Sequence, residues 1–546
     1  MTLRILRGIW QPTWQAVDCR WRRRSSPEGL LPGLPGTRSA RALILTVGQG
    51  IKGGPVTIVE TTSGPIEGRE KGGSLLFAGV PYAAPPTGEA RFKAARPVAP
   101  WQEVRSAQRF GPAAPQIPTG GLTSSTPVRW DEDCLTLNIS TPAADGKKRP
   151  VLFWIHGGAY RTGQGAIPWY AGGKFATQGD IVTVSINYRL GVLGFLDVSH
   201  LGEDYATSGV NGLLDQIMAL RWVKANIERF GGDPEKVTIA GESAGGFAVS
   251  TLLASPETAG LFRGAIPQSG AAQHTLPKSA GEICAEKFMA KTGARTAEAL
   301  AGLSAEAVLD AQNAVAAEIG EDLGELKTFG VPVSSFYPVE GNRVVPKSPL
   351  AAIREGAGSN VAVMTGSNRE ETTLWGYGEV NEGKLEHFAD LYGATSALEV
   401  YRQTRPHASP DELLIALTTD HMFRIPAIRL LEARLEADPG SRNWLYRFDW
   451  KSRAFEGRLG ATHALEIPFA FDNLDKAGVD VFLGPGESPQ HVADVMHKAW
   501  TRFIRDQDPG WGAFDTEQRL TMRFDDESGA VADPDAEERL AWDGLR

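Results

Sequence analysis

One short segment constrains the fold of this chain more than any other: Gly241-Glu242-Ser243-Ala244-Gly245. It follows an apolar, β-type run at 236–240 and leads into 246–253, which has the composition of a helix. A strand, a tight turn and a helix therefore meet at a serine. The two glycines permit a turn too sharp for side chains, so we expect Ser243 Oγ to stand exposed at the end of a sheet. This context makes Ser243 a candidate nucleophile.

The chain around this turn alternates strands and helices. The runs 150–155 and 180–186 are apolar almost throughout, which is typical of central parallel strands covered on both faces. The run 213–230 has the spacing of an amphipathic helix, and 361–365 indicates a further strand. Strand, helix and strand at these lengths predict right-handed crossovers. We expect an α/β fold with a doubly wound, mostly parallel central sheet and helices on both faces, in one domain over residues 56–546.

Residues 1–55 differ from the rest in composition. They are rich in arginine, proline and glycine, and their apolar run at 42–47 is too short for a secretory signal. A disordered tail or a start site assigned too far upstream is the expectation. The segment 48–53 fits G-x-G-x-x-G, but β-branched residues follow it where a dinucleotide site needs a helix. Nucleotide binding is therefore not predicted.

Charge and cysteine usage exclude several classes of function. A net charge of -9 argues against nucleic acid as a partner. No run of eighteen apolar residues occurs, so no membrane span is predicted. Cys19, Cys134 and Cys284 have no metal-ligand spacing and cannot all pair. We expect a reduced, cytoplasmic location with no metal or cofactor; a secreted or periplasmic location stays open if the tail is a degenerate signal.

A serine nucleophile needs a base, and the base needs a third group to orient it. Of the histidines downstream, His463 lies in a loop of small residues just past the strand-like run 444–448. His421, His491 and His497 lie in helix-like polar stretches and are expected to be structural or on the surface. For the acid, adjacent Glu370 and Glu371 follow the predicted strand 361–365, and spacing alone does not choose between them.

The oxyanion of a tetrahedral intermediate needs preorganised N–H donors. One is expected from Ala244, the residue after the nucleophile. The others are expected from the loop 156–159, directly after the strand that ends at Ile155, where small residues let the backbone approach a substrate. A simple glycine turn is the alternative interpretation of this loop, and its occurrence together with the serine turn, in the right order, makes that alternative the weaker one.

Taken together, these residues resemble the type-B carboxylesterase family of α/β-hydrolases. The resemblance covers nearly all of 56–524 and rests on four further ordered motifs, at 77–88, 132–138, 187–191 and 231–234. It implies Glu371 rather than Glu370 as the acid and His463 as the base. By the same resemblance the oxyanion donors are Gly158, Ala159 and Ala244, residues that help to hold the histidine are Glu242, Ser269 and Glu466, and a structural ion pair joins Arg189 and Asp215.

Three departures from the family pattern are informative. Cys134 matches a cysteine that is disulfide-bonded in many relatives, but its partner position is Ala114, so that bridge cannot form. Ser124 occupies the place of the tryptophan that stacks on quaternary ammonium in cholinesterases, so choline esters are not expected as substrates. Thr372 replaces the glycine that usually follows the acid, which weakens the assignment of Glu371 without overturning it.

The sequence therefore predicts a serine hydrolase that cleaves small-molecule carboxylic esters through an acyl-enzyme on Ser243. An amidase or carbamate hydrolase with the same triad is one alternative. A catalytically inactive binding or adhesion protein is another, which the intact set of Ser243, Glu371 and His463 argues against. The natural substrate and the oligomeric state are not predicted. Candidate pocket aromatics are Tyr160, Trp169, Tyr170 and Trp375, each of which could instead belong to the core.

Overall fold

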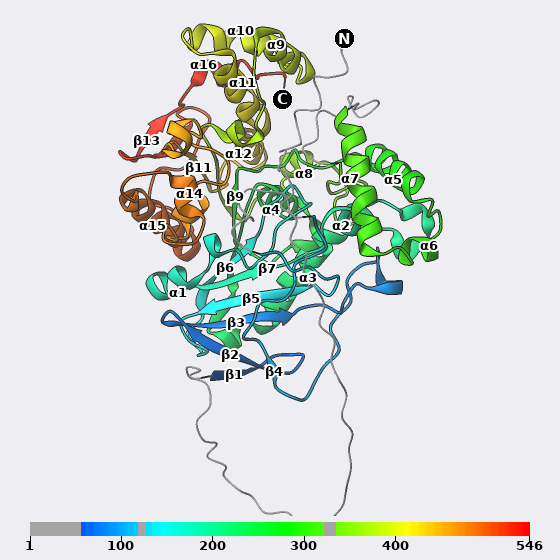
Figure 1. The fold of residues 1–546 in the computed structure, drawn as a ribbon. Coiled ribbons are helices and arrows are strands. Elements are labelled where there is room, and N and C mark those ends of the chain that lie inside the picture. Colours follow the sequence, from blue (N-terminus) through cyan, green and yellow to red (C-terminus); the bar gives the residue numbers. More distant parts are fainter. Residues whose placement is uncertain (1–55, 118–126, 322–334, 546) are drawn as a thin grey trace, which may run out of the picture.

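The computed structural model describes residues 56–117, 127–321 and 335–545 (Figure 1). Three subjects of the sequence analysis lie outside the described residues: the tail 1–55 with its glycine-rich segment, Cys19 and Ser124. Within the described part, no helix is both long and apolar enough to cross a membrane.

A single 13-stranded sheet forms the centre of the described part of the molecule (Figure 1). Its strands are β1 Val56–Glu60, β2 Pro65–Lys71, β3 Ser74–Pro81, β4 Arg105–Ser106, β5 Thr136–Thr141, β6 Arg149–Ile155, β7 Val182–Ile186, β8 Gly232–Glu242, β9 Gly264–Gln268, β10 Ala362–Asn368, β11 Asn443–Phe448, β12 Leu520–Phe524 and β13 Gly529–Ala532. The spatial order is β1-β2-β3-β5-β7-β6-β8-β9-β10-β11-β12-β13, with β4 beside β2. From β7 to β12 all neighbours are parallel, and the strands outside that block pair antiparallel apart from β4.

Helices lie on both faces of this sheet. The α-helices are α1 Gly173–Gly179, α2 Gly191–Phe195, α3 Asn211–Asn226, α4 Ala244–Ala254, α5 Lys278–Thr292, α6 Ala297–Ala301, α7 Ala305–Glu321, α8 Pro349–Arg354, α9 Glu382–Leu391, α10 Thr395–Thr404, α11 Pro410–Thr419, α12 Ile425–Ala437, α13 Ile467–Ala470, α14 Val479–Leu483, α15 Gln490–Asp506 and α16 Ala536–Leu540. In Figure 1, α9, α10, α11 and α16 gather at one end of the molecule and α5, α6 and α7 at one side.

The apolar strands owe their composition to burial on two faces. In β6, Phe153 and Ile155 pack into the core that α3 and α4 cover, whereas Leu152 and Trp154 pack into a second core with α1, α13 and α15. All four side chains are 1% exposed or less. A fully buried phenylalanine or leucine contributes about 1.5–3 kcal/mol to folding, so a strand of this kind favours apolar residues at every position.

The sheet and its crossovers confirm the predicted fold class, with small differences at element ends. The predicted helix 213–230 is α3 followed by a 3₁₀ turn, Ile227–Phe230. β8 begins at Gly232, earlier than the predicted start at 236, because Gly232 already pairs with Arg149 of β6. Because the sheet is continuous from β1 to β13, we propose that residues 56–546 form one domain.

Candidate active site

The candidate nucleophile stands at a strained turn between β8 and α4. Ser243 has φ 57° and ψ −124°, a conformation that few residues other than glycine adopt. A Cβ on Gly241 would lie 2.6 Å from the backbone of both Gly245 and Ile155, so this turn requires glycine. Ser243 occupies the N-cap position of α4, yet among the described residues its side chain makes no capping hydrogen bond. The hydroxyl of this partly exposed serine is thus left for other chemistry.

The candidate base and acid are in direct contact. His463 Nδ1 lies 2.6 Å from Glu371 Oε2, and the backbone N–H of His463 donates to Glu371 O at 3.1 Å. The Glu371 side chain is fully buried, and the imidazole is 12% exposed. The other oxygen of the carboxylate, Oε1, accepts the backbone N–H of Asn368 at 2.8 Å. Both oxygens of Glu371 are therefore fixed, and one of them holds the imidazole.

The second nitrogen of the imidazole faces Glu242, the residue before Ser243. His463 Nε2 lies 3.0 Å from Glu242 Oε1. The contact has the distance of an ion pair but not the alignment of a hydrogen bond, since Glu242 Oε1 accepts none among the described residues. Burial alone favours the neutral imidazole, but the charges of Glu242 and Glu371 outweigh it and raise the pKa of His463 well above 6.5.

A third buried carboxyl group, that of Glu466, lies close enough to Glu242 and Glu371 to feel their charges. Burial, together with the charges of Glu242 and Glu371, raises the pKa of Glu466 to about 8. It accepts hydrogen bonds from Gln268 Nε2 at 3.1 Å and from Asn368 Nδ2 at 2.7 Å. Glu466 therefore gives the site two further hydrogen-bond acceptors, in surroundings that disfavour its own negative charge.

The resemblance also named Ser269, with Glu242 and Glu466, as a residue that helps to hold the histidine. Ser269 follows β9. It has φ 44°, and its N–H donates to Gly366 O at 2.9 Å. Its Oγ is buried and has no hydrogen-bond partner among the described residues. Of these three residues, only Glu242 contacts the imidazole. Glu466 contacts Asn368, and Ser269 contacts strand β10.

The loop after β6 packs directly on the serine turn. A Cβ on Gly157 would lie 2.6 Å from Glu242 O and 3.0 Å from Ser243 Cβ, so the loop can approach this closely only as glycine. Gly158 and Ala159 follow with φ 111° and 54°. In the described part of the chain, the N–H groups of Gly158, Ala159 and Ala244 donate to no other protein group. Ala244 is also the first residue of α4, where N–H groups and the helix dipole favour negative charge.

Two aromatic rings border the imidazole. Trp375 lies edge-on to His463 with ring centroids 5.2 Å apart, and Phe423 lies 5.0 Å away on a tilted plane. Of the candidate pocket aromatics, only Trp375 contacts a predicted site residue in this way among the described residues, whereas Trp169 and Tyr170 belong to a hydrophobic core. Tyr160 is fully buried beside Phe195.

Phe423 was not predicted from the sequence. It lies in a π-helical turn, Asp420–Arg424, between α11 and α12. Such turns occur often at functional sites because they redirect side chains. Pro426 follows and lacks the N–H that an α-helix would direct to Met422 O, so it was the one available signal of an irregular helix here.

The departures from the family pattern have structural explanations. Cys134 and Cys284 are free and buried. This was expected for Cys134, because alanine stands at position 114, where many relatives have its disulfide partner. Thr372 is buried, and its hydroxyl lies 2.7 Å from Thr418 Oγ1 of α11, so its side chain is accommodated by that helix. The predicted ion pair is present, with Arg189 Nη2 2.7 Å from Asp215 Oδ1.

Comparison with known proteins decides the family. Residues 55–541 match the model of the carboxylesterase family. The chain belongs to this family. It is 35% identical to para-nitrobenzyl esterase of Bacillus subtilis (strain 168) over 500 residues, which cover 88% of this chain and 97% of that protein. It is 36% identical to phenmedipham hydrolase of Pseudarthrobacter oxydans over 502 residues, covering 87% and 96%.

Solved carboxylesterases share the fold. The structure of carboxylesterase EST55 from Geobacillus stearothermophilus at pH 6.2 superposes with a TM-score of 0.78 at 38% identity, covering 89% of this chain and 100% of that one. The predicted α/β-hydrolase fold is therefore confirmed, and this member of the carboxylesterase family is a carboxylic ester hydrolase.

Proposed function

We propose that Ser243, His463 and Glu371 form the catalytic triad of a serine esterase acting on small-molecule carboxylic esters. The observation that carries the proposal is the position of the His463 imidazole. One nitrogen is held by the buried Glu371, and the other reaches Glu242, the residue adjacent to Ser243 on the turn. A base held at Nδ1 by a carboxylate, on a loop that meets the turn carrying Ser243, is the arrangement expected of a triad that activates a hydroxyl.

The reaction proceeds in two acyl-transfer steps. Neutral His463 takes the proton of Ser243 through Nε2 as Oγ attacks the ester carbonyl, and Glu371 stabilises the imidazolium. The N–H groups of Gly158, Ala159 and Ala244 receive the oxyanion. The tetrahedral intermediate then expels the alcohol, which takes the proton from His463. Water attacks the acyl-enzyme with the same base, releasing the acid and restoring Ser243.

Labelling with a fluorophosphonate tests the nucleophile. One equivalent is expected to bind covalently to Ser243, found by peptide mapping, with hydrolysis of p-nitrophenyl esters lost in proportion. Esters from acetate to decanoate in the same assay would report the size of the acyl pocket. A label on another residue would contradict the proposal. Labelling at Ser243 without turnover of any ester would favour an amidase or carbamate hydrolase.

The pH dependence of kcat/KM tests the electrostatics of His463. Only the neutral imidazole accepts the serine proton, so activity is expected to rise with pH through an apparent pKa above 6.5. Glu242→Gln removes one of the two charges that raise this pKa, and the acidic limb is expected to move to lower pH. Exposed Glu228→Gln is the control and leaves the limb in place. An unmoved limb in Glu242→Gln would show that Glu242 does not set this pKa.

The cellular location is part of the same proposal. Two free, buried thiols, Cys134 and Cys284, favour a reducing and therefore cytoplasmic compartment.

A further inference from the structure

The segment that carries the acid and the loop that carries the histidine are bonded together along their length. Hydrogen bonds that join residues 368–373 to residues 459–463 include His463 N to Glu371 O at 3.1 Å, Glu370 N to Ala461 O at 3.0 Å, Asn368 Nδ2 to Thr462 O at 2.6 Å, and Thr373 Oγ1 to Leu459 O at 2.8 Å and to Thr462 Oγ1 at 2.6 Å. The two segments therefore form one hydrogen-bonded unit, and the contacts between them determine where the imidazole lies.

Glu370, the glutamate that does not contact the imidazole, contributes a side-chain contact to this unit. Its Oε2 accepts the backbone N–H of Ala461 at 2.8 Å, and the Lys451 ammonium lies 2.7 Å from Oε1. Gly460 has φ +59°, and a Cβ there would collide with the Glu370 carboxylate. The carboxylate thus lies directly over the peptide that precedes Ala461, two residues before His463.

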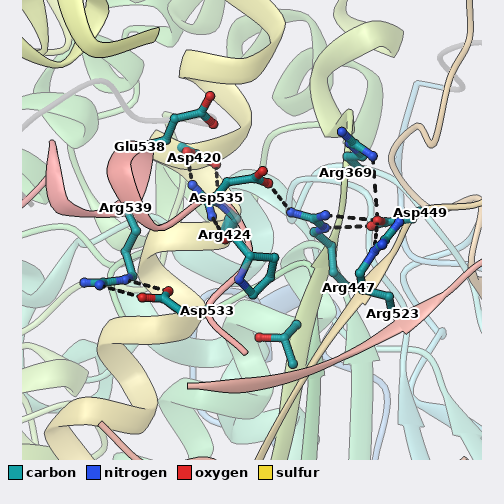
Figure 2. Close-up of polar contacts among 12 residues, drawn as sticks. Arg369, Asp420, Arg424, Arg447, Asp449, Arg523, Asp533, Asp535, Glu538 and Arg539 are labelled. Atoms are coloured by element: carbon teal, nitrogen blue, oxygen red, sulfur yellow. Dashed lines mark hydrogen bonds and ion pairs between the residues drawn. The ribbon is translucent and has the colours of Figure 1, made fainter. Parts of the chain in front are cut away.

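The acid segment is the better anchored partner of the two. Arg369 N–H donates to Phe448 O at 3.0 Å, and its side chain lies 3.8 Å from Asp449. Figure 2 shows Arg447 and Arg523 directed at the same Asp449 carboxylate. The Nε atom of each arginine lies 2.6 Å from an oxygen of this carboxylate, which is fully buried. The backbone bond to Phe448 and a charge network centred on the buried Asp449 therefore hold the residue next to Glu370.

The loop that carries His463, residues 453–463, is exposed and irregular on its N-terminal side. Phe455 is 64% exposed, and Phe455 and Glu456 both have left-handed backbones, with φ 51° and 61°. The loop closes where Ser452 N–H donates to Gly460 O at 3.0 Å. Beyond that point Ala461 packs into the core, and the next hydrogen bonds toward His463 are those made with the acid segment, which therefore orients the loop.

We propose that Glu370 is a positioning residue for acyl transfer, whose Oε2 holds the Ala461 N–H and thereby fixes the loop that presents His463 to Ser243. This inference rests on the proposed triad. A misplacement of about 1 Å in a catalytic group costs on the order of 10²-fold in rate. Loss of the acceptor is therefore expected to reduce kcat and to change substrate binding little.

Three variants separate the acceptor from the charge. Glu370→Met keeps the unbranched shape and removes the acceptor, Glu370→Gln keeps an amide oxygen as acceptor, and Lys451→Met removes only the cation. We expect kcat of Glu370→Met to fall about 10- to 100-fold with KM within about 3-fold of wild type. Glu370→Gln and Lys451→Met are expected to stay within about 3-fold in kcat. Rates are taken per active site, counted by fluorophosphonate titration to completion.

Each outcome decides the inference. A kcat of Glu370→Met within about 2-fold of wild type would overturn it. An equal loss in Glu370→Gln would assign the effect to charge and would also overturn it. If Glu370→Met does not fold, Glu370→Ala takes its place, with Glu370→Gln again as the rescuing variant. Ser243→Ala is assayed alongside: turnover retained there refutes the triad itself, whereas an inactive Ser243→Ala beside an unaffected Glu370→Met refutes only the role of Glu370.

Discussion

Ser243→Ala is expected to lower kcat for p-nitrophenyl acetate by about 10⁴- to 10⁶-fold. In the proposed mechanism the substitution removes the atom that forms the acyl-enzyme and leaves the proposed oxyanion donors in place. Stability is expected to change little, because Ser243 Oγ makes no capping bond among the described residues. The measurement is steady-state turnover. A mock purification from the same host without the gene shows that no host esterase contributes to the rate.

Ser250→Ala is the matched control for this prediction. Ser250 lies on the same helix, α4, and its buried Oγ has no hydrogen-bond partner among the described residues. The substitution removes an unsatisfied polar group, so activity and stability should both be retained. If Ser243→Ala kept more than about a tenth of the wild-type kcat, the acyl-enzyme mechanism on Ser243 would be refuted.

The serine turn was predictable because several independent signals coincide there. In the sequence, the apolar run 236–240, the glycines Gly241 and Gly245 and the helix-like run 246–253 follow one another directly. In the structure, neither glycine has room for a Cβ and α4 begins at Ala244. The start of β8 was not predictable in the same way. The sequence Gly231-Gly232-Asp233-Pro234 has turn composition, but pairing of Gly232 with β6 extends the strand, which is a tertiary effect.

The adjacent glutamates show why spacing could not select the acid. Glu371 begins a 3₁₀ turn, Glu371–Trp375, and its side chain meets His463. Glu370, one residue earlier, has an irregular backbone with φ −131° and ψ 51°, and its carboxylate meets Ala461 instead. The direction of each side chain depends on this local turn, which composition does not encode. Only the family resemblance favoured Glu371.

Side-chain contacts between elements that are far apart in the sequence could not be predicted either. Phe423 reaches His463 because of a π-helical turn. Glu242 reaches Nε2 because the end of β8 meets a loop whose histidine, His463, lies 221 residues later in the chain. Sequence periodicity describes the face of one element, not which side chain of another element reaches it.

Glu371→Gln is expected to lower kcat by about 10³- to 10⁴-fold, although it changes a single atom type. The Asn368 N–H donates to Oε1 at 2.8 Å, so the glutamine would keep its carbonyl oxygen there and turn its amide NH₂ toward His463 Nδ1. Nδ1 would then accept a hydrogen bond, and the imidazole proton would move to Nε2. In that tautomer Nε2 has no lone pair with which to accept the proton of Ser243.

Glu370→Gln is the matched control, because it makes the same chemical change one residue away. Its amide oxygen can still accept the Ala461 N–H, so kcat is expected to remain within about 3-fold of wild type. Both variants are compared by kcat per titrated active site from pH 6 to 9. A near-normal Glu371→Gln beside an inactive Glu370→Gln would exchange the two roles and make Glu370 the acid. Loss in Glu371→Gln alone would establish that, of two neighbouring carboxylates, only the one bonded to Nδ1 selects the tautomer on which catalysis depends.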